Sequence, residues 1–149
     1  MKRRFLGYVR GRLLMQVVLP LPPTDNNIYF NMPGGGRALT DRAKAYKRAT
    51  ASVIAEMAAT AAVEFPKNVP YIVRTWVYFT QIETKGWAKG KAQNRYMRVD
   101  TGNRSKLIED SIASAIGIDD RHFFDKHHYK RCDPSNPRVE VELREREDA

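Results

Sequence analysis

The 149-residue sequence has a single cysteine, Cys132, and no long apolar run. One cysteine excludes an internal disulfide framework and any zinc site built on paired cysteines. The lack of an apolar run of about 18 residues excludes a predicted membrane-spanning helix. The basic N-terminal stretch has neither an uninterrupted apolar segment nor a small-residue cleavage site, which disfavours a secretory signal. We therefore expect a cytoplasmic protein with no membrane association.

Acidic residues are also in the minority, with 17 against 26 lysines and arginines, so the formal net charge is +9. Residues 85–106 contain seven basic side chains, one acid and the rings of Trp87 and Tyr96. Cations that contact phosphates, interleaved with rings that stack on bases, favour nucleic-acid binding over a basic loop without a partner. The side chains predicted to make these contacts are Lys85, Lys89, Lys91, Arg95, Arg98, Asn103 and Arg104.

The pattern of apolar residues predicts one α+β domain with two main helices. Helices are expected over Asp41–Glu64, capped by Thr40 and ended by Pro66, and over Gly102–Ile116, ended by Gly117. The buried stripe of the first helix is expected to be Tyr46, Val53, Ile54, Met57 and Ala61. Strands are expected at 13–19, 69–81, 123–131 and 138–144, with a small excursion at 28–30 and 37–39 around three glycines. This order predicts a mixed or antiparallel sheet.

The most informative stretch lies in and around the second helix. Asn103, Lys106 and Asp110 are spaced three and four residues apart, so they share one stripe of that helix. Asp100 precedes its first turn, and Asp119 and Asp120 follow its end. Carboxylates within a basic region suggest a divalent-metal site that serves phosphodiester chemistry. The alternative is that Asp100 only caps the helix and that Lys106 and Asp110 form an ordinary exposed ion pair.

A zinc site at His122, His127, His128 and Cys132 is a weaker prediction. Adjacent residues of a strand point to opposite faces, and the sequence contains no paired-ligand motif of the usual spacing.

Three motifs together resemble the RusA family of Holliday junction resolvases. They are L-P-L-P-P-T-D-N-N-I-Y from Leu19, T-D-R-A-K-A-Y from Thr40, and D-x-x-N-x-x-K-x-x-x-D from Asp100, which is followed by D-D at Asp119. The resemblance extends from Val17 to Leu143. It implies a nuclease domain over residues 15–149 that follows a basic extension, residues 1–14.

The resemblance further implies a phage or bacterial homodimer that binds branched DNA and cuts four-way junctions with Mg²⁺, or Mn²⁺ in its place. It implies no small-molecule cofactor. Asp100, Lys106 and Asp120 match essential residues of the family, and Asp100 and Asp120 are the implied metal ligands. Asp110 and Asp119 are further candidate ligands.

The family usually has a second aspartate at the position of Gly102. We expect water to take its place, because Mg²⁺ commonly retains several waters. Replacement by Asp110 is the alternative. The same residues would also suit a junction-binding protein that has lost cleavage through Gly102, and the basic charge alone would suit a general RNA-binding module.

Overall fold

A four-stranded sheet forms one layer of the protein. The computed structural model describes residues 11–24, 27–87, 95–96 and 102–147. The strands are β1 (Gly11–Leu19), β4 (Tyr71–Phe79), β5 (Phe123–Cys132) and β6 (Arg138–Arg146), in the order β1-β6-β4-β5. β6 pairs antiparallel with β1 and β4, whereas β4 and β5 are parallel. The sheet is therefore mixed, and the predicted α+β class is confirmed.

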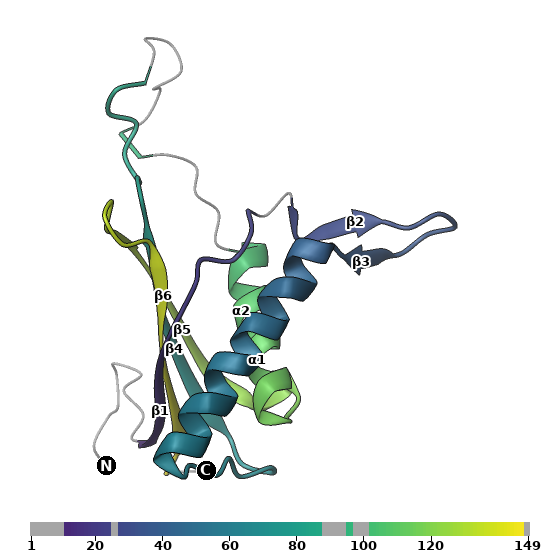
Figure 1. Cartoon of the computed structure of the whole chain (residues 1–149), viewed down its shortest axis with the longest axis vertical. Coiled ribbons are helices and arrows are strands. Elements are labelled where there is room, and N and C mark those ends of the chain that lie inside the picture. Colours follow the sequence, from purple (N-terminus) through teal and green to yellow (C-terminus); the bar gives the residue numbers. More distant parts are fainter. Residues whose placement is uncertain (1–10, 25–26, 88–94, 97–101, 148–149) are drawn as a thin grey trace, which may run out of the picture.

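Helices α1 (Asp41–Ala61) and α2 (Gly102–Ile116) cover one face of this sheet (Figure 1). Thr40 caps α1 as predicted, since its Oγ1 accepts a hydrogen bond from the Ala43 amide at 3.1 Å. The helix ends before the predicted Glu64 because Ala62 adopts a left-handed conformation, with φ 52°. In the part of the chain that the structure describes, no helix has the length and hydropathy needed to cross a membrane.

The core lies between the helices and the sheet. Alternate β4 residues from Tyr71 to Phe79 face the helices, because successive strand side chains point to opposite faces. Buried α1 residues complete this layer, and here the predicted stripe needs correction: Ala61 is exposed. The buried positions of α1 are Ala43, Tyr46, Thr50 and Ile54, with Val53 and Met57 partly buried.

A two-stranded hairpin, β2 (Tyr29–Asn31) and β3 (Arg37–Leu39), projects from the end of the molecule at which α1 and α2 begin (Figure 1). Its base is fixed by the Thr40 amide, which donates to the Ile28 carbonyl at 2.9 Å. The three consecutive glycines at its tip, residues 34–36, all have positive φ angles. Glycine adopts this region at no steric cost. The predicted excursion is thus confirmed as a hairpin.

A buried polar link joins α2 to the sheet. The Glu109 carboxylate lies 3.1 Å from Nε2 of His128 on β5, and Nδ1 of the same ring lies 2.5 Å from Oγ1 of Thr75 on β4. Lys126 Nζ lies 3.6 Å from the same carboxylate. Glu109 is 6% exposed and Thr75 is fully buried, so the link lies inside the interface between the helix and the sheet. It ties the helix to both strands of the parallel pair.

Removing the central carboxylate tests how much this link stabilises the fold. We expect Glu109→Ala to lower the free energy of unfolding by about 2 kcal/mol, because His128 and Lys126 lose a buried partner. Glu109→Gln, which keeps a hydrogen-bonding group, should cost less. Urea denaturation measures both.

The control is Glu56→Ala, the same change at an exposed position of α1. A surface substitution of this kind should change the free energy of unfolding by less than about 0.5 kcal/mol. Equal losses in the two alanine variants would contradict the stabilising role of the link.

Candidate metal and phosphate site

Asp110 and Asp120 come together although ten positions separate them in the sequence. Asp110 lies on α2 with a half-buried side chain, and Asp120 opens the short 3₁₀ helix η2 (Asp120–His122). The two carboxyl groups lie close enough for Asp120 to affect the titration of Asp110. Burial raises the pKa of Asp110; Asp120 adds to the rise, while the charges of Lys106 and Lys47 oppose it. Two acids in contact form a site that favours a proton or a cation.

The chain reversal after α2 produces this contact. Gly117 has a positive φ angle, and the Ile118 amide donates to the Ala113 carbonyl at 2.9 Å. This combination closes the helix in a Schellman motif. Lys67 Nζ donates to the carbonyls of Ile116 and Gly117 at 3.0 and 3.3 Å. The predicted glycine cap is confirmed, and the reversal sends the following residues back past the helix they have just left.

Asp119 has a structural task beside the acid pair. Its Oδ1 accepts a hydrogen bond from the Arg121 amide at 2.9 Å and so caps η2. This hydrogen bond holds the pKa of Asp119 below its usual value. Within residues 11–24, 27–87, 95–96 and 102–147, no three His, Cys, Asp or Glu side chains gather closely enough to hold a metal ion. The described site therefore offers two carboxylates, and Asp100 lies outside the described residues.

Two lysines flank the acid pair. Lys106 Nζ lies 4.0 Å from Oδ2 of Asp110, and the side chain is 57% exposed, so its ammonium group is open to a ligand. The second cation, Lys47, approaches from α1 and is half-buried. Sequence reasoning missed Lys47. Its position directly after the buried Tyr46 places it at the border of the core stripe, and this spacing could have indicated it.

Contacts that the structure describes hold part of the basic segment, residues 85–106, in place. Glu83 and Tyr96 form a β-bridge, and Arg95 pairs with Glu83 at 3.0 Å while its guanidinium lies over the Tyr96 ring. Lys85 and Trp87 are exposed there. Lys89, Lys91 and Arg98 lie outside the described residues, so their predicted DNA contacts stay predictions.

The start of α2 is fixed by the motif that precedes the hairpin. Arg104 Nε donates to the Pro23 carbonyl at 3.2 Å, and its guanidinium lies 5.2 Å from the centre of the Phe79 ring. Arg104 thus holds the proline-rich segment against the helix that carries the site. Asn103, one residue earlier, is half-buried. A DNA contact by either side chain remains a prediction.

The weaker zinc hypothesis gains no support from the described residues. His127 and His128 point to opposite faces of β5: His128 binds Glu109, whereas His127 stacks on Tyr129 with 6.5 Å between ring centres. Cys132 is exposed at the end of the strand.

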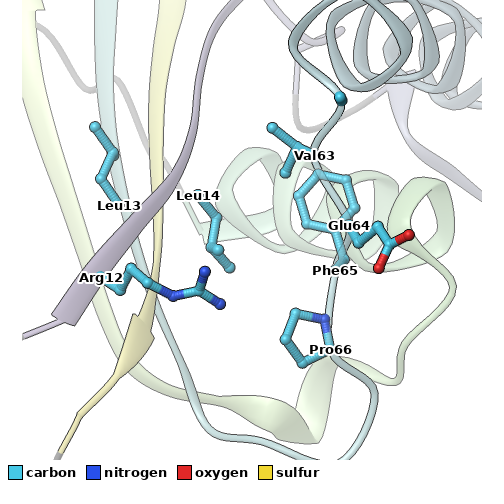
Figure 2. A pocket seen from close by; sticks show the side chains of 8 residues that line it. Arg12, Leu13, Leu14, Val63, Glu64, Phe65 and Pro66 are labelled. Carbon is cyan, nitrogen blue, oxygen red and sulfur yellow. The ribbon is translucent and has the colours of Figure 1, made fainter.

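A cavity of about 490 Å³ lies away from the acid pair, between β1 and the segment that follows α1 (Figure 2). Leu14, Phe65 and Pro66 line it together with the charged side chains of Arg12 and Glu64 (Figure 2). Arg12 is already paired with Glu145 at 2.7 Å. The cavity shares no lining residue with the site at Asp110 and Asp120.

Similarity to known proteins lies at the level of the family. No curated protein matches the chain. The family model of endodeoxyribonuclease RusA matches residues 20–144, a span that includes the proline-rich segment, the hairpin, both helices and the acid pair. Because this match covers most of the 149 residues, the chain belongs to the RusA family of endodeoxyribonucleases.

Proposed function

We propose that this protein is a metal-dependent endonuclease that resolves four-way DNA junctions by paired phosphodiester hydrolysis. Membership of the RusA family supports the endonuclease activity. The observation that carries the rest of the proposal is the pair Asp110 and Asp120, since Lys106 and Lys47 both act on Asp110. Carboxylates that hold a cation, next to ammonium groups that hold a phosphate, are the components that phosphodiester hydrolysis needs.

The donor set fits a hard divalent cation. Mg²⁺ and Mn²⁺ bind carboxylate oxygens, and Mg²⁺ is usually held by one or two carboxylates together with waters and substrate phosphate. Asp110 and Asp120 would hold it, with Asp100 as a third candidate. The sequence alone favours water in place of the aspartate that the family usually has at the position of Gly102. The proximity of Asp110 to Asp120 instead favours Asp110 as the replacement ligand. The chemistry that the cation supplies when bound is activation of water and stabilisation of the leaving oxygen.

The chain's own side chains position the scissile phosphate. The exposed ammonium group of Lys106 neutralises charge that develops on the phosphate oxygens as water attacks phosphorus. Lys47 adds positive charge from the opposite helix. The bond from phosphorus to the 3′ oxygen breaks, which leaves a 5′-phosphate and a 3′-hydroxyl. Asn103, on the same stripe of α2 as Lys106, is suited to orient the strand.

Neutralising either acid tests the site. We expect Asp110→Asn and Asp120→Asn to slow cleavage of a synthetic four-way junction by more than about 100-fold, the upper range for residues that only support a metal ligand. Junction binding should persist, because the cations that contact phosphates remain. Single-turnover cleavage and fluorescence anisotropy measure the two properties. The control is Glu56→Gln, an exposed carboxylate of α1.

Calorimetric titration with Mn²⁺ adds a readout that is independent of cleavage. Both Asp→Asn variants should bind the ion more weakly than the wild type does. If Asp110→Asn retains wild-type cleavage and Mn²⁺ affinity, water rather than Asp110 fills the position opposite Asp120. If the wild type binds junctions but never cleaves them, the protein is a non-cleaving binder.

The lysines should act mainly on the chemical step. Lys106→Ala is expected to slow single-turnover cleavage by about 100-fold, as the loss of a transition-state contact does, while junction affinity changes little. Lys47→Ala should also slow cleavage with little change in junction affinity, but the loss of rate should be smaller. Equal losses in affinity and rate would make either lysine an ordinary phosphate contact. Both quantities come from the same protein titration.

The face of the sheet opposite α1 and α2 supports a homodimer. Trp76 stacks on Tyr129 with ring centres 5.4 Å apart, and Arg138 lies 3.9 Å from the Tyr78 ring centre. The face also carries acids and bases side by side, including Glu142, which contacts Arg74 and Arg144 at 2.8 and 2.7 Å. Burial raises the pKa of Glu142, but hydrogen bonds from these two arginines outweigh that effect and hold the pKa below its usual value. Mixed charge and aromatic area suit a second copy related by twofold symmetry.

A charge at the centre of this face should separate the subunits. We expect Trp76→Glu to change the mass in light scattering from twice the 17.1 kDa of the chain to that of one chain. Burial of an unpaired carboxylate costs free energy, so the variant should not form the dimer. Tyr96→Glu, an exposed aromatic position outside the sheet, is the matched control. A Trp76→Glu dimer, or a wild-type monomer, would contradict this interface.

A further inference from the structure

The β2–β3 hairpin has two faces of different character. Tyr29 and Leu39 are paired residues on one face, and both pack against the core. By strand alternation Phe30 and Ala38 occupy the opposite face. Phe30 is 48% exposed, and Met32, just beyond the strand, is 46% exposed. Core packing therefore accounts for the first face and leaves the large apolar side chains of the second unexplained.

The hairpin is also placed where DNA would approach. It leads directly into α1 through Thr40, and its Arg37 lies over the Tyr29 ring at 4.6 Å. On α1, Lys47 and Arg48 follow Lys44 by three and four residues, so the three side chains share one flank of the helix. Lys47 acts on Asp110, so this flank faces the acid pair. A row of positive charge thus connects the hairpin with the candidate site.

We propose that the β2–β3 hairpin binds the branch point of a DNA junction, where Phe30 and Met32 contact exposed bases and the basic flank of α1 holds the adjoining backbone. The proposal rests on the nuclease function above and extends it to recognition of branched DNA. At a branch point, base faces become available that are covered within a continuous duplex. Aromatic side chains gain from stacking on such faces whatever the base, while lysine and arginine supply the sequence-independent contacts.

Charge favours DNA over a protein partner for this surface. The hairpin and the first two turns of α1 carry Arg37, Arg42, Lys44, Lys47 and Arg48 against a single acid, Asp41. All of these basic side chains are exposed except Lys47, which is half-buried. A second copy of the chain would bring the same positive charge against itself, which is unfavourable. A polyanion neutralises it.

The test compares two double variants of the full-length protein. Phe30→Ala with Met32→Ala should weaken binding to a synthetic four-way junction by about tenfold, within the range for the loss of one stacked base. Its affinity for a linear duplex of the same sequence should be unchanged. Lys44→Ala with Arg48→Ala should weaken binding to both DNAs and reduce the slope of log K against log salt by about 2. Fluorescence anisotropy without divalent cations measures affinity and excludes cleavage.

A fluorescent base analogue, 2-aminopurine, at the junction centre reports base exposure directly. Its emission should fall when wild-type protein binds, because Phe30 covers the exposed base, and should fall less with the Phe30/Met32 variant. The matched control is Leu13→Ala, which removes an apolar side chain of similar exposure, 44%, from β1 rather than from the hairpin. The control should bind like wild type.

Several outcomes would overturn the proposal. Equal losses on junction and duplex in the Phe30/Met32 variant would deny branch-point contact. Unchanged junction affinity would deny any DNA contact by these side chains. A change of mass in light scattering would assign the face to protein association. Because cleavage of the same junction by the wild type is measured separately with divalent cations, failure of the nuclease function itself would be distinguished from failure of this proposal.

Discussion

The contact between Asp110 and Asp120 depends on one chain reversal, at Gly117. A helix that continued for another turn would carry the two later aspartates away from the acid halfway along it. The left-handed glycine and the Lys67 ammonium, which binds the last carbonyls of α2, stop the helix and return the chain. The site therefore consists of a helix and the segment just after it, held by a cap that lies outside the site.

The same helix is fixed from three other directions. Its first turn is held by Arg104 against Pro23, its buried side by Glu109 against His128, and its apolar stripe by the core. Such multiple anchoring suits a helix that presents Lys106 and Asp110, because like-charged carboxylates repel and only a rigid frame keeps them close without a cation. Rigidity here is a condition for the chemistry.

Much of the fold could be predicted from the sequence, because each element carries a local signal. Thr40 predicted the start of a helix as a capping residue, and Gly117 predicted the end of one as a glycine cap. The alternation of apolar and charged residues in β6 predicted a strand with one covered face. The predicted end of α1 was wrong, because the left-handed turn occurs at Ala62, where no glycine in the sequence indicates it. In the site, spacing placed Lys106 and Asp110 on one stripe. Lys47 was missed although its place next to Tyr46 could have indicated it, whereas Glu109 could not be found, because its role depends on which strand lies opposite the helix.

The parallel pairing of β4 with β5 has a consequence for how this protein can vary. Parallel neighbours need a crossover, and here it contains residues 80–101 followed by α2. Both ends of that span are fixed, one by β4 and the other by the anchored start of α2. The loop-closure entropy of a connection between fixed ends grows slowly, so that each doubling of its length costs only about 0.6 kcal/mol. Related chains can therefore change the length of this connection at little cost in stability while the acid pair stays in place.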